Sequence, residues 1–187
     1  IYYLVKKSKY LGKTKLIKLL YLADYEHYKY FDNEISDIEY IRWNFGPYSP
    51  EVCDCIDEMV AIKIITIQRG ISVLKSRDYY SFNIIGKYNY TDDLKTEEIE
   101  FIKYILKKYD HLEIDELIKI AYATEPMTET SRRGEILDFR VREKVVARKL
   151  SIIRKELNAE MGLTKQYDPK DSLIDEELIL HKTTPAS

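Results

Sequence analysis

Residues 38–52, IEYIRWNFGPYSPEV, constrain the fold more than any other part of the chain. The stretch begins with side chains that alternate between two sides and include aromatic and β-branched types, which is typical of a strand. Gly46 and Pro47 then interrupt the strand, because glycine permits φ > 0 and proline lacks an N–H for the sheet. Ser49 as N-cap and Pro50 at the first helical position start a helix. We therefore predict a strand, a rigid corner in which Gly46 needs either φ > 0 or a close backbone approach, and a capped helix.

Helical periodicity recurs through the rest of the chain. After a short helix that ends near Lys9, apolar stripes predict helices over about residues 14–30, 50–60, 96–109, 114–123 and 136–160. β-rich runs predict a hairpin with its arms at 62–68 and 79–85, in which Ser72 to Asp78 is either a mobile tip or a continuation of the first arm. Together with residues 38–45, these arms are expected to form one small antiparallel sheet. The expected fold is thus mainly α with a small antiparallel β-sheet, an α+β class.

The polar, turn-like segment from Gly86 to Leu94 divides the predicted domain into two lobes. Strand, helix and hairpin in that order make the first lobe, about residues 1–90, winged-helix-like. Residues 94–130 form a helical C-terminal lobe. Residues 131–160 contain a long C-terminal helix, and the polar residues 161–187 are expected to be an extended arm or tail.

Composition excludes several classes of function. The net charge of −2 over 187 residues gives no global field for nucleic acid or an anionic membrane. The sequence has no apolar run of about eighteen residues, so we expect a cytoplasmic protein without a membrane span. Cys53 and Cys55 are two residues apart on a helix, which points their sulfurs to nearly opposite sides, so we expect free thiols. Abundant Ile, Lys, Glu and Tyr give a thermophile-like composition.

We find no catalytic or metal-binding constellation in the sequence. Asp24 and His27 are three apart on one helix and are the nearest approach to an ion site, but no third ligand follows them. A solvated pair on a polar edge is the favoured interpretation. No Gly-rich phosphate loop and no serine or cysteine paired with a placed histidine is present. We therefore expect no cofactor and no enzyme activity.

DNA binding is the alternative function, because the predicted helix and hairpin resemble a winged helix. The helix from Pro50 to Val60 would enter the major groove. It carries no Lys or Arg and four carboxylates: Glu51, Asp54, Asp57 and Glu58. Phosphate would repel such a helix, so nucleic acid is the less favoured partner.

The helix predicted over 136–160 has an apolar seam and a basic face. Phe139, Val146 and Ile153 are seven residues apart, and Leu150 and Leu157 form a second such pair. The basic face makes a second candidate interface, which includes Arg140, Lys144, Arg148 and Arg154. Two interpretations stay open: a partner-binding or dimerising helix that produces a homo-oligomer, or a terminal helix docked on its own domain.

Two sequence pieces resemble a known family. KLIKLLYLAD from Lys15 to Asp24, and Tyr40 to Phe45 followed by GPYSPEV from Gly46, look like the Panacea domain of the SocA-like antitoxins. The similarity covers roughly residues 1–130. It implies an antitoxin that neutralises a partner toxin by direct binding or, in the SocA case, by delivering it to a protease. The family brings no cofactor and no active site.

We expect the partner-binding residues around the corner formed by Gly46, Pro47 and Pro50. Trp, Tyr and Arg carry most interface energy, because they bury a large area and keep a polar group. The candidates are Arg42, Trp43, Tyr48 and Ser49, with Asp24 and Tyr25 nearby. The alternative places Trp43 and Phe45 in the core, since they share one strand face with Ile41.

Overall fold

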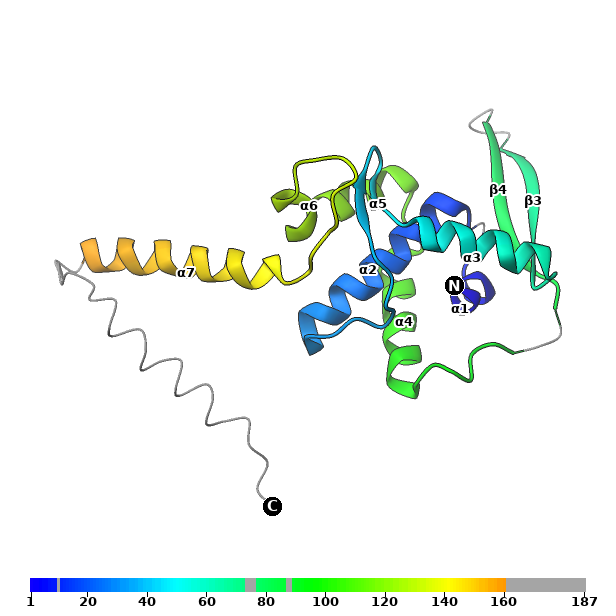
Figure 1. The fold of residues 1–187 in the computed structure, drawn as a ribbon, viewed down its shortest axis with the longest axis horizontal. Coiled ribbons are helices and arrows are strands. Elements are labelled where there is room, and N and C mark those ends of the chain that lie inside the picture. Colours follow the sequence, from blue (N-terminus) through cyan, green and yellow to red (C-terminus); the bar gives the residue numbers. More distant parts are fainter. Residues whose placement is uncertain (10, 73–76, 87–88, 161–187) are drawn as a thin grey trace, which may run out of the picture. The chain divides into compact units, whose positions relative to one another are not determined.

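The computed structural model describes residues 1–9, 11–72, 77–86 and 89–160 (Figure 1). The elements in chain order are α1 (Tyr2–Lys7), α2 (Lys13–Phe31), β1 (Ile41–Trp43), β2 (Gly46–Tyr48), α3 (Pro50–Ala61), β3 (Ile65–Ser72), β4 (Arg77–Ile84), α4 (Thr96–Tyr109), α5 (Ile114–Tyr122), α6 (Glu125–Glu129) and α7 (Val141–Glu160). The expected class, mainly α with a small antiparallel β part, is confirmed, and the β part consists of two two-stranded sheets. The chain forms two compact units, residues 1–143 and 144–187. Among the described residues, no helix is long and apolar enough to cross a membrane.

Helix α2 is the centre of the first unit and is buried over most of its length. Leu16, Leu19 and Leu22 are fully enclosed among residues of α1, α3, α4 and α5. The polar residues of α2 hold neighbouring segments: Lys15 pairs with Asp110 at 3.1 Å, and Glu26 accepts a hydrogen bond from Lys108 at 2.7 Å. Helix α2 therefore anchors both the apolar core and the C-terminal end of α4 (Figure 1).

The strand predicted over 38–45 does not join the later hairpin. Strands β1 and β2 form a two-stranded antiparallel sheet of their own, with Ile41 opposite Tyr48 and Trp43 opposite Gly46. The prediction that Gly46-Pro47 ends the strand is wrong, because these residues start β2 and the chain turns at Asn44–Phe45 instead. Of the two alternatives predicted for Gly46, the positive φ is confirmed, at +89°. The predicted corner is thus a tight hairpin.

The second hairpin, β3–β4, is confirmed between residues 65 and 84. It follows α3 as the winged arrangement requires, and most of its predicted tip, residues 73–76, lies outside the described residues. The N–H of Phe82 donates to the carbonyl of Leu11 at 3.0 Å and ties β4 to the start of α2. A Cβ on Gly12 would lie 2.8 Å from the Tyr80 carbonyl oxygen, so this approach requires glycine.

The prediction of a helix from residue 136 is wrong, because α7 begins at Val141. Gly134 ends a turn, and residues 135–137 then lie along β1, with Ile136 opposite Ile41 in antiparallel orientation. The N–H of Arg42 donates to the Glu135 carbonyl and that of Gly134 to the Arg42 carbonyl, both at 2.8 Å. Phe139 is buried in the core of the first unit. Burial of the Phe139 ring stabilises this course of the chain more than one further turn at the start of α7 would. A short helix, α6, also occupies part of the interval between the helices predicted over 114–123 and 136–160.

Helix α7 contains no buried residue. Of the four predicted basic residues, Lys144, Arg148 and Arg154 lie on it, whereas Arg140 precedes it and pairs with Asp138 at 2.9 Å. The predicted arm or tail, residues 161–187, lies outside the described residues.

Candidate partner-binding surface

A buried lysine on α2 holds the β1–β2 hairpin. The Lys18 ammonium donates a hydrogen bond to the carbonyl oxygen of Pro47, and the side chain is almost fully buried. Burial lowers the pKa of Lys18 to about 8, because removal from water disfavours the charged form. The two sequence pieces that carry the family resemblance therefore contact each other through this bond.

Tyr122, the last residue of α5, holds the hairpin turn. Its hydroxyl lies 3.1 Å from the carbonyl oxygen of Trp43 and 2.9 Å from that of Asn44, and donates toward both. Its ring lies 3.5 Å from the position that a Cβ would occupy on Gly46. One side chain thus supports the turn through its hydroxyl and the start of β2 through its ring.

Arg42 ties β1 to α6. Its guanidinium donates to the carbonyl oxygen of Met127 and lies 5.4 Å from the centre of the Tyr122 ring. Both arrangements suit a guanidinium, which is a planar donor that stacks on aromatic faces. Arg42 is half-buried, and its side chain is engaged within the chain.

The outer side of the hairpin carries a stack of three side chains. The Arg133 guanidinium lies 3.8 Å from the centre of the Trp43 ring, and that ring stacks on Tyr48 at 5.9 Å with 28° between the planes. The Tyr48 hydroxyl accepts a hydrogen bond from the Cys53 thiol at 3.1 Å. Trp43 and Tyr48 are both half-buried, so Trp43 is neither a core residue nor freely exposed.

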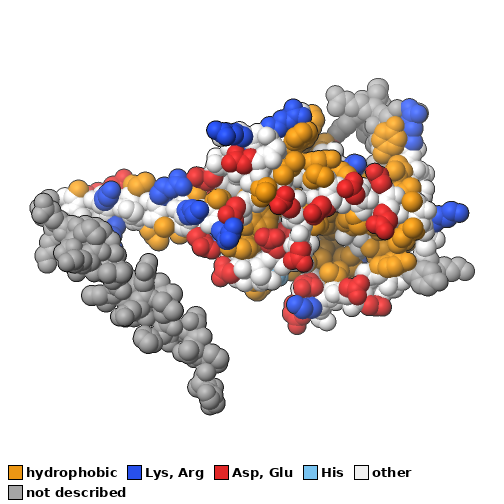
Figure 2. Space-filling model, viewed as in Figure 1, with side chains coloured by type: hydrophobic (Ala, Val, Ile, Leu, Met, Phe, Trp, Pro, Cys, Tyr) orange, Lys and Arg blue, Asp and Glu red, His pale blue; other side chains and the backbone are white. Residues whose placement is uncertain are grey.

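Two apolar side chains beside this stack face solvent. Phe45 at the turn is 66% exposed and Ile136 is 54% exposed, so the alternative that places Phe45 in the core is wrong. We call Trp43, Phe45, Tyr48, Arg133 and Ile136 the hairpin surface. Figure 2 shows hydrophobic side chains gathered over this hairpin with basic side chains next to them. Exposed apolar groups beside arginine are typical of a protein contact.

Three of the predicted contact residues are buried. Ser49 is fully enclosed and caps α3 by accepting from the Val52 N–H at 3.5 Å. Tyr25 donates to Glu125, and its burial raises its pKa. Asp24 accepts hydrogen bonds from Ile35, Ser36 and Tyr40, while its burial raises its pKa. These side chains hold the chain together and do not reach the surface.

The interpretation of Asp24 and His27 as a solvated pair is also wrong. Both are buried, and the His27 Nδ1 atom lies 2.6 Å from the Asn33 carbonyl oxygen. The imidazole ring packs edge-on against Phe101, with ring centres 5.0 Å apart. Within the described residues, no group of three or more His, Cys, Asp and Glu side chains is arranged to hold a metal ion.

The outer face of α3 is acidic. Its four carboxylates are all exposed, and acidic side chains are spread over this part of the surface in Figure 2. They are Glu51, Asp54, Asp57 and Glu58. Contact between this helix and DNA phosphates would be repulsive, which agrees with the sequence argument against a DNA-reading helix.

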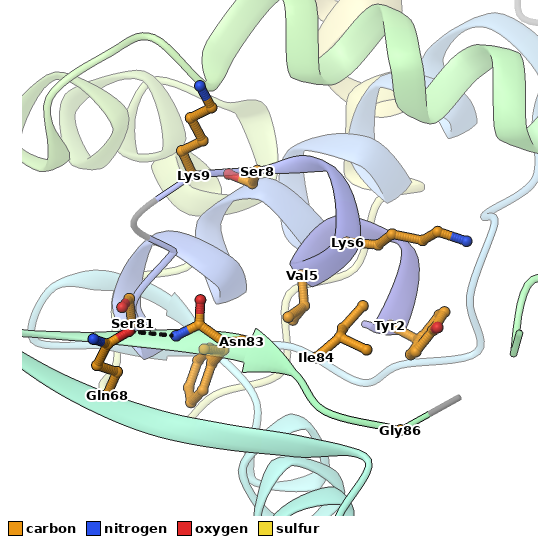
Figure 3. A pocket seen from close by; sticks show the side chains of 11 residues that line it. Tyr2, Val5, Lys6, Ser8, Lys9, Gln68, Ser81, Asn83, Ile84 and Gly86 are labelled. Carbon is orange, nitrogen blue, oxygen red and sulfur yellow. Dashed lines mark hydrogen bonds between the residues drawn. The ribbon is translucent and has the colours of Figure 1, made fainter. Parts of the chain in front are cut away.

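An open groove of about 760 Å³ lies between α1 and the β3–β4 hairpin (Figure 3). Gln68 and Asn83 face it and satisfy each other across the strands by a hydrogen bond of 3.1 Å. Lys6 and Lys9 point in different directions, away from each other. Because its polar groups do not converge on one point, the groove lacks the pattern of a small-molecule site.

Sequence reasoning missed Lys18 and Tyr122, which hold the hairpin, and also Arg133 and Ile136, which belong to the hairpin surface. Lys18 and Tyr122 read as ordinary helix residues, and no local signal shows that they reach a hairpin. Arg133 precedes the helix predicted over 136–160, and nothing in the pair Arg132-Arg133 shows that one of them stacks on Trp43.

Comparison with protein families agrees with the resemblance. The model for the antitoxin SocA-like, Panacea domain matches residues 16–126, whereas no curated protein and no solved structure matches the chain. The matched segment contains the whole β1–β2 hairpin together with Lys18 and Tyr122, which hold it. Since the match spans more than half of the 187 residues, the chain belongs to the SocA-like antitoxin family and carries its Panacea domain.

Proposed function

We propose that this chain is an antitoxin that binds a toxin protein through the hairpin surface and neutralises it by that contact. Membership of the SocA-like antitoxin family carries the proposal. The structure supports the position of the contact, because Trp43, Tyr48 and Arg133 are the residue types that dominate interface energies.

Rigidity favours this hairpin as a binding surface. Its backbone is held by the bonds from Lys18 to Pro47 and from Tyr122 to Trp43, and its own Arg42 bonds to Met127 in α6. A surface that is already fixed loses little conformational freedom on binding, so more of the contact energy contributes to affinity. In the proposed site, Arg42 acts by fixing the hairpin, and Trp43, Phe45 and Tyr48 make the contact. The buried Asp24, Tyr25 and Ser49 are left out of it.

Co-expression tests the proposed function. The candidate toxin is the product of the gene adjacent to the one that encodes this chain. Expressed alone it should arrest growth, and co-expression of this chain should restore growth. Purified, the two proteins should form a complex by gel filtration. Growth arrest that persists despite soluble expression of this chain, without a complex, would show that this toxin is not its partner.

A further inference from the structure

Helix α7 presents an apolar seam that nothing covers among the described residues. Val146, Leu150, Ile153 and Leu157 are between 40% and 61% exposed. Their spacing of four, three and four residues places them on one helix face, as in positions d, a, d and a of a heptad. Four large apolar side chains aligned on one face predict a helical partner with a matching seam.

We propose that α7 pairs with α7 of a second copy of this chain in antiparallel orientation. In this register Leu150 packs opposite Ile153 of the second copy, and Val146 packs opposite Leu157. The four layers are then related by a two-fold axis, so that each copy contributes the same residues. The contact uses residues 146–157 alone and does not rest on the proposed toxin binding.

The charges that flank the seam select the antiparallel orientation. In a parallel pair, position g of one helix faces position e in the next heptad of the other helix. Lys149 of each copy would then face Arg154 of the other copy, which gives two such contacts per pair. In the antiparallel pair, Lys149 faces Glu156 of the second copy, and Arg154 faces the small Ala147. The parallel pair therefore has two repulsive contacts where the antiparallel pair has two attractive ones.

The remaining basic side chains of α7 are compatible with this contact. Lys144, Arg148 and Lys155 fall at heptad positions b and f, away from the seam. They stay on the outer face of the pair, in water. Ile152, 55% exposed, also lies off the seam and supplies a matched control for its neighbour Ile153.

Sedimentation equilibrium of the full chain tests whether the seam pairs. We expect a monomer–dimer equilibrium in which Ile153→Asp raises the dissociation constant by about thirtyfold or more, because it buries a charge between apolar layers. Ile152→Asp makes the same change outside the seam and should stay within about threefold of the parent. A parent chain that is monomeric at about 0.5 mM, or equal effects of the two variants, would overturn the proposal.

Charge exchange tests the orientation. In the antiparallel pair, Lys149→Glu and Glu156→Lys each replace two attractive contacts by repulsive ones, so each should weaken the dimer by about tenfold at low salt. The double variant should restore parental affinity. Lys155→Glu, the same charge change on the outer face, is the control and should have little effect. Stronger dimerisation of Lys149→Glu would contradict the proposal, because it would show that the introduced carboxylate faces Arg154 in a parallel pair.

Discussion

Replacement of Gly46 tests the backbone of the hairpin. Its φ of +89° places any L-residue in the left-handed region, which costs roughly 1–2 kcal/mol. A Cβ there would lie 3.5 Å from the Lys18 side chain and the Tyr122 ring, an ordinary contact without a clash. We therefore expect Gly46→Ala to lower the free energy of unfolding by about 1–2 kcal/mol. Gly46→Val should lower it by about 3 kcal/mol, because its branched side chain extends toward the same neighbours.

Substitutions at Gly134 and Gly12 separate the cost of a left-handed φ from the cost of crowding around an added Cβ. Gly134 has a similar φ of +84° but no atom within 4 Å of its would-be Cβ, so alanine and valine there should cost nearly the same, about 1–2 kcal/mol. Gly12 has an ordinary φ of −89°, but its Cβ would lie 2.8 Å from the Tyr80 carbonyl oxygen. Gly12→Ala should therefore cost about 1–3 kcal/mol through crowding alone.

Urea denaturation followed by tryptophan fluorescence measures these effects. Trp43 is the only tryptophan and lies opposite Gly46 in the hairpin, so its signal reports the unfolding of this region. The expected order of cost is Gly46→Val above Gly46→Ala, with Gly134→Ala close to Gly46→Ala. A Gly46→Val variant that unfolds at the same urea midpoint as the parent would show that neither the positive φ nor the contacts around residue 46 constrain this position.

Two further predictions concern the residues that hold the hairpin. Burial lowers the pKa of Lys18 from 10.5 to about 8, so between these values the unfolded chain binds more protons and stability rises with pH. Urea denaturation at pH 7 and pH 10 measures this effect: over that range the free energy of unfolding of the parent should rise by about 2 kcal/mol relative to that of Lys18→Met. If the difference in free energy between the two proteins were the same at both pH values, it would contradict the burial of the Lys18 charge. Arg42→Ala removes the bond to Met127 and the contact with Tyr122, and should lower the melting temperature by several degrees at a cost of about 1–3 kcal/mol; an unchanged melting temperature would show that Arg42 does not fix the hairpin.

Local signals in the sequence predict local structure well. Ser49 and Pro50 mark the start of α3 because a cap depends only on the next few residues. The positive φ of Gly46 and the β3–β4 hairpin also follow from residue types close together in the chain. The turn at Asn44–Phe45 was missed, because a glycine and a proline directly after it give a stronger turn signal.

Long-range packing explains the errors in the predicted site. The sequence pattern places Asp24 on the polar edge of a helix. Its hydrogen-bond partners, however, come from the loop that follows α2, and the side chain is buried. Phe139 has the spacing of a helical seam, and this spacing does not reveal whether the ring packs on another helix or in its own core. Among the predicted contacts, Trp43 and Tyr48 do lie together on the surface, because they are cross-strand neighbours in a short hairpin.

The binding affinity of Phe45→Ala for the toxin tests whether the hairpin surface makes the contact. Phe45 is exposed, so its replacement should leave the melting temperature unchanged, yet it should weaken toxin binding by more than about 1 kcal/mol in isothermal titration calorimetry. Phe31→Ala is the matched control, because Phe31 is 57% exposed at the end of α2, outside the hairpin surface. We expect parental affinity for Phe31→Ala and reduced affinity for Phe45→Ala. Parental affinity for Phe45→Ala, with or without an effect of Phe31→Ala, would contradict binding through the hairpin surface.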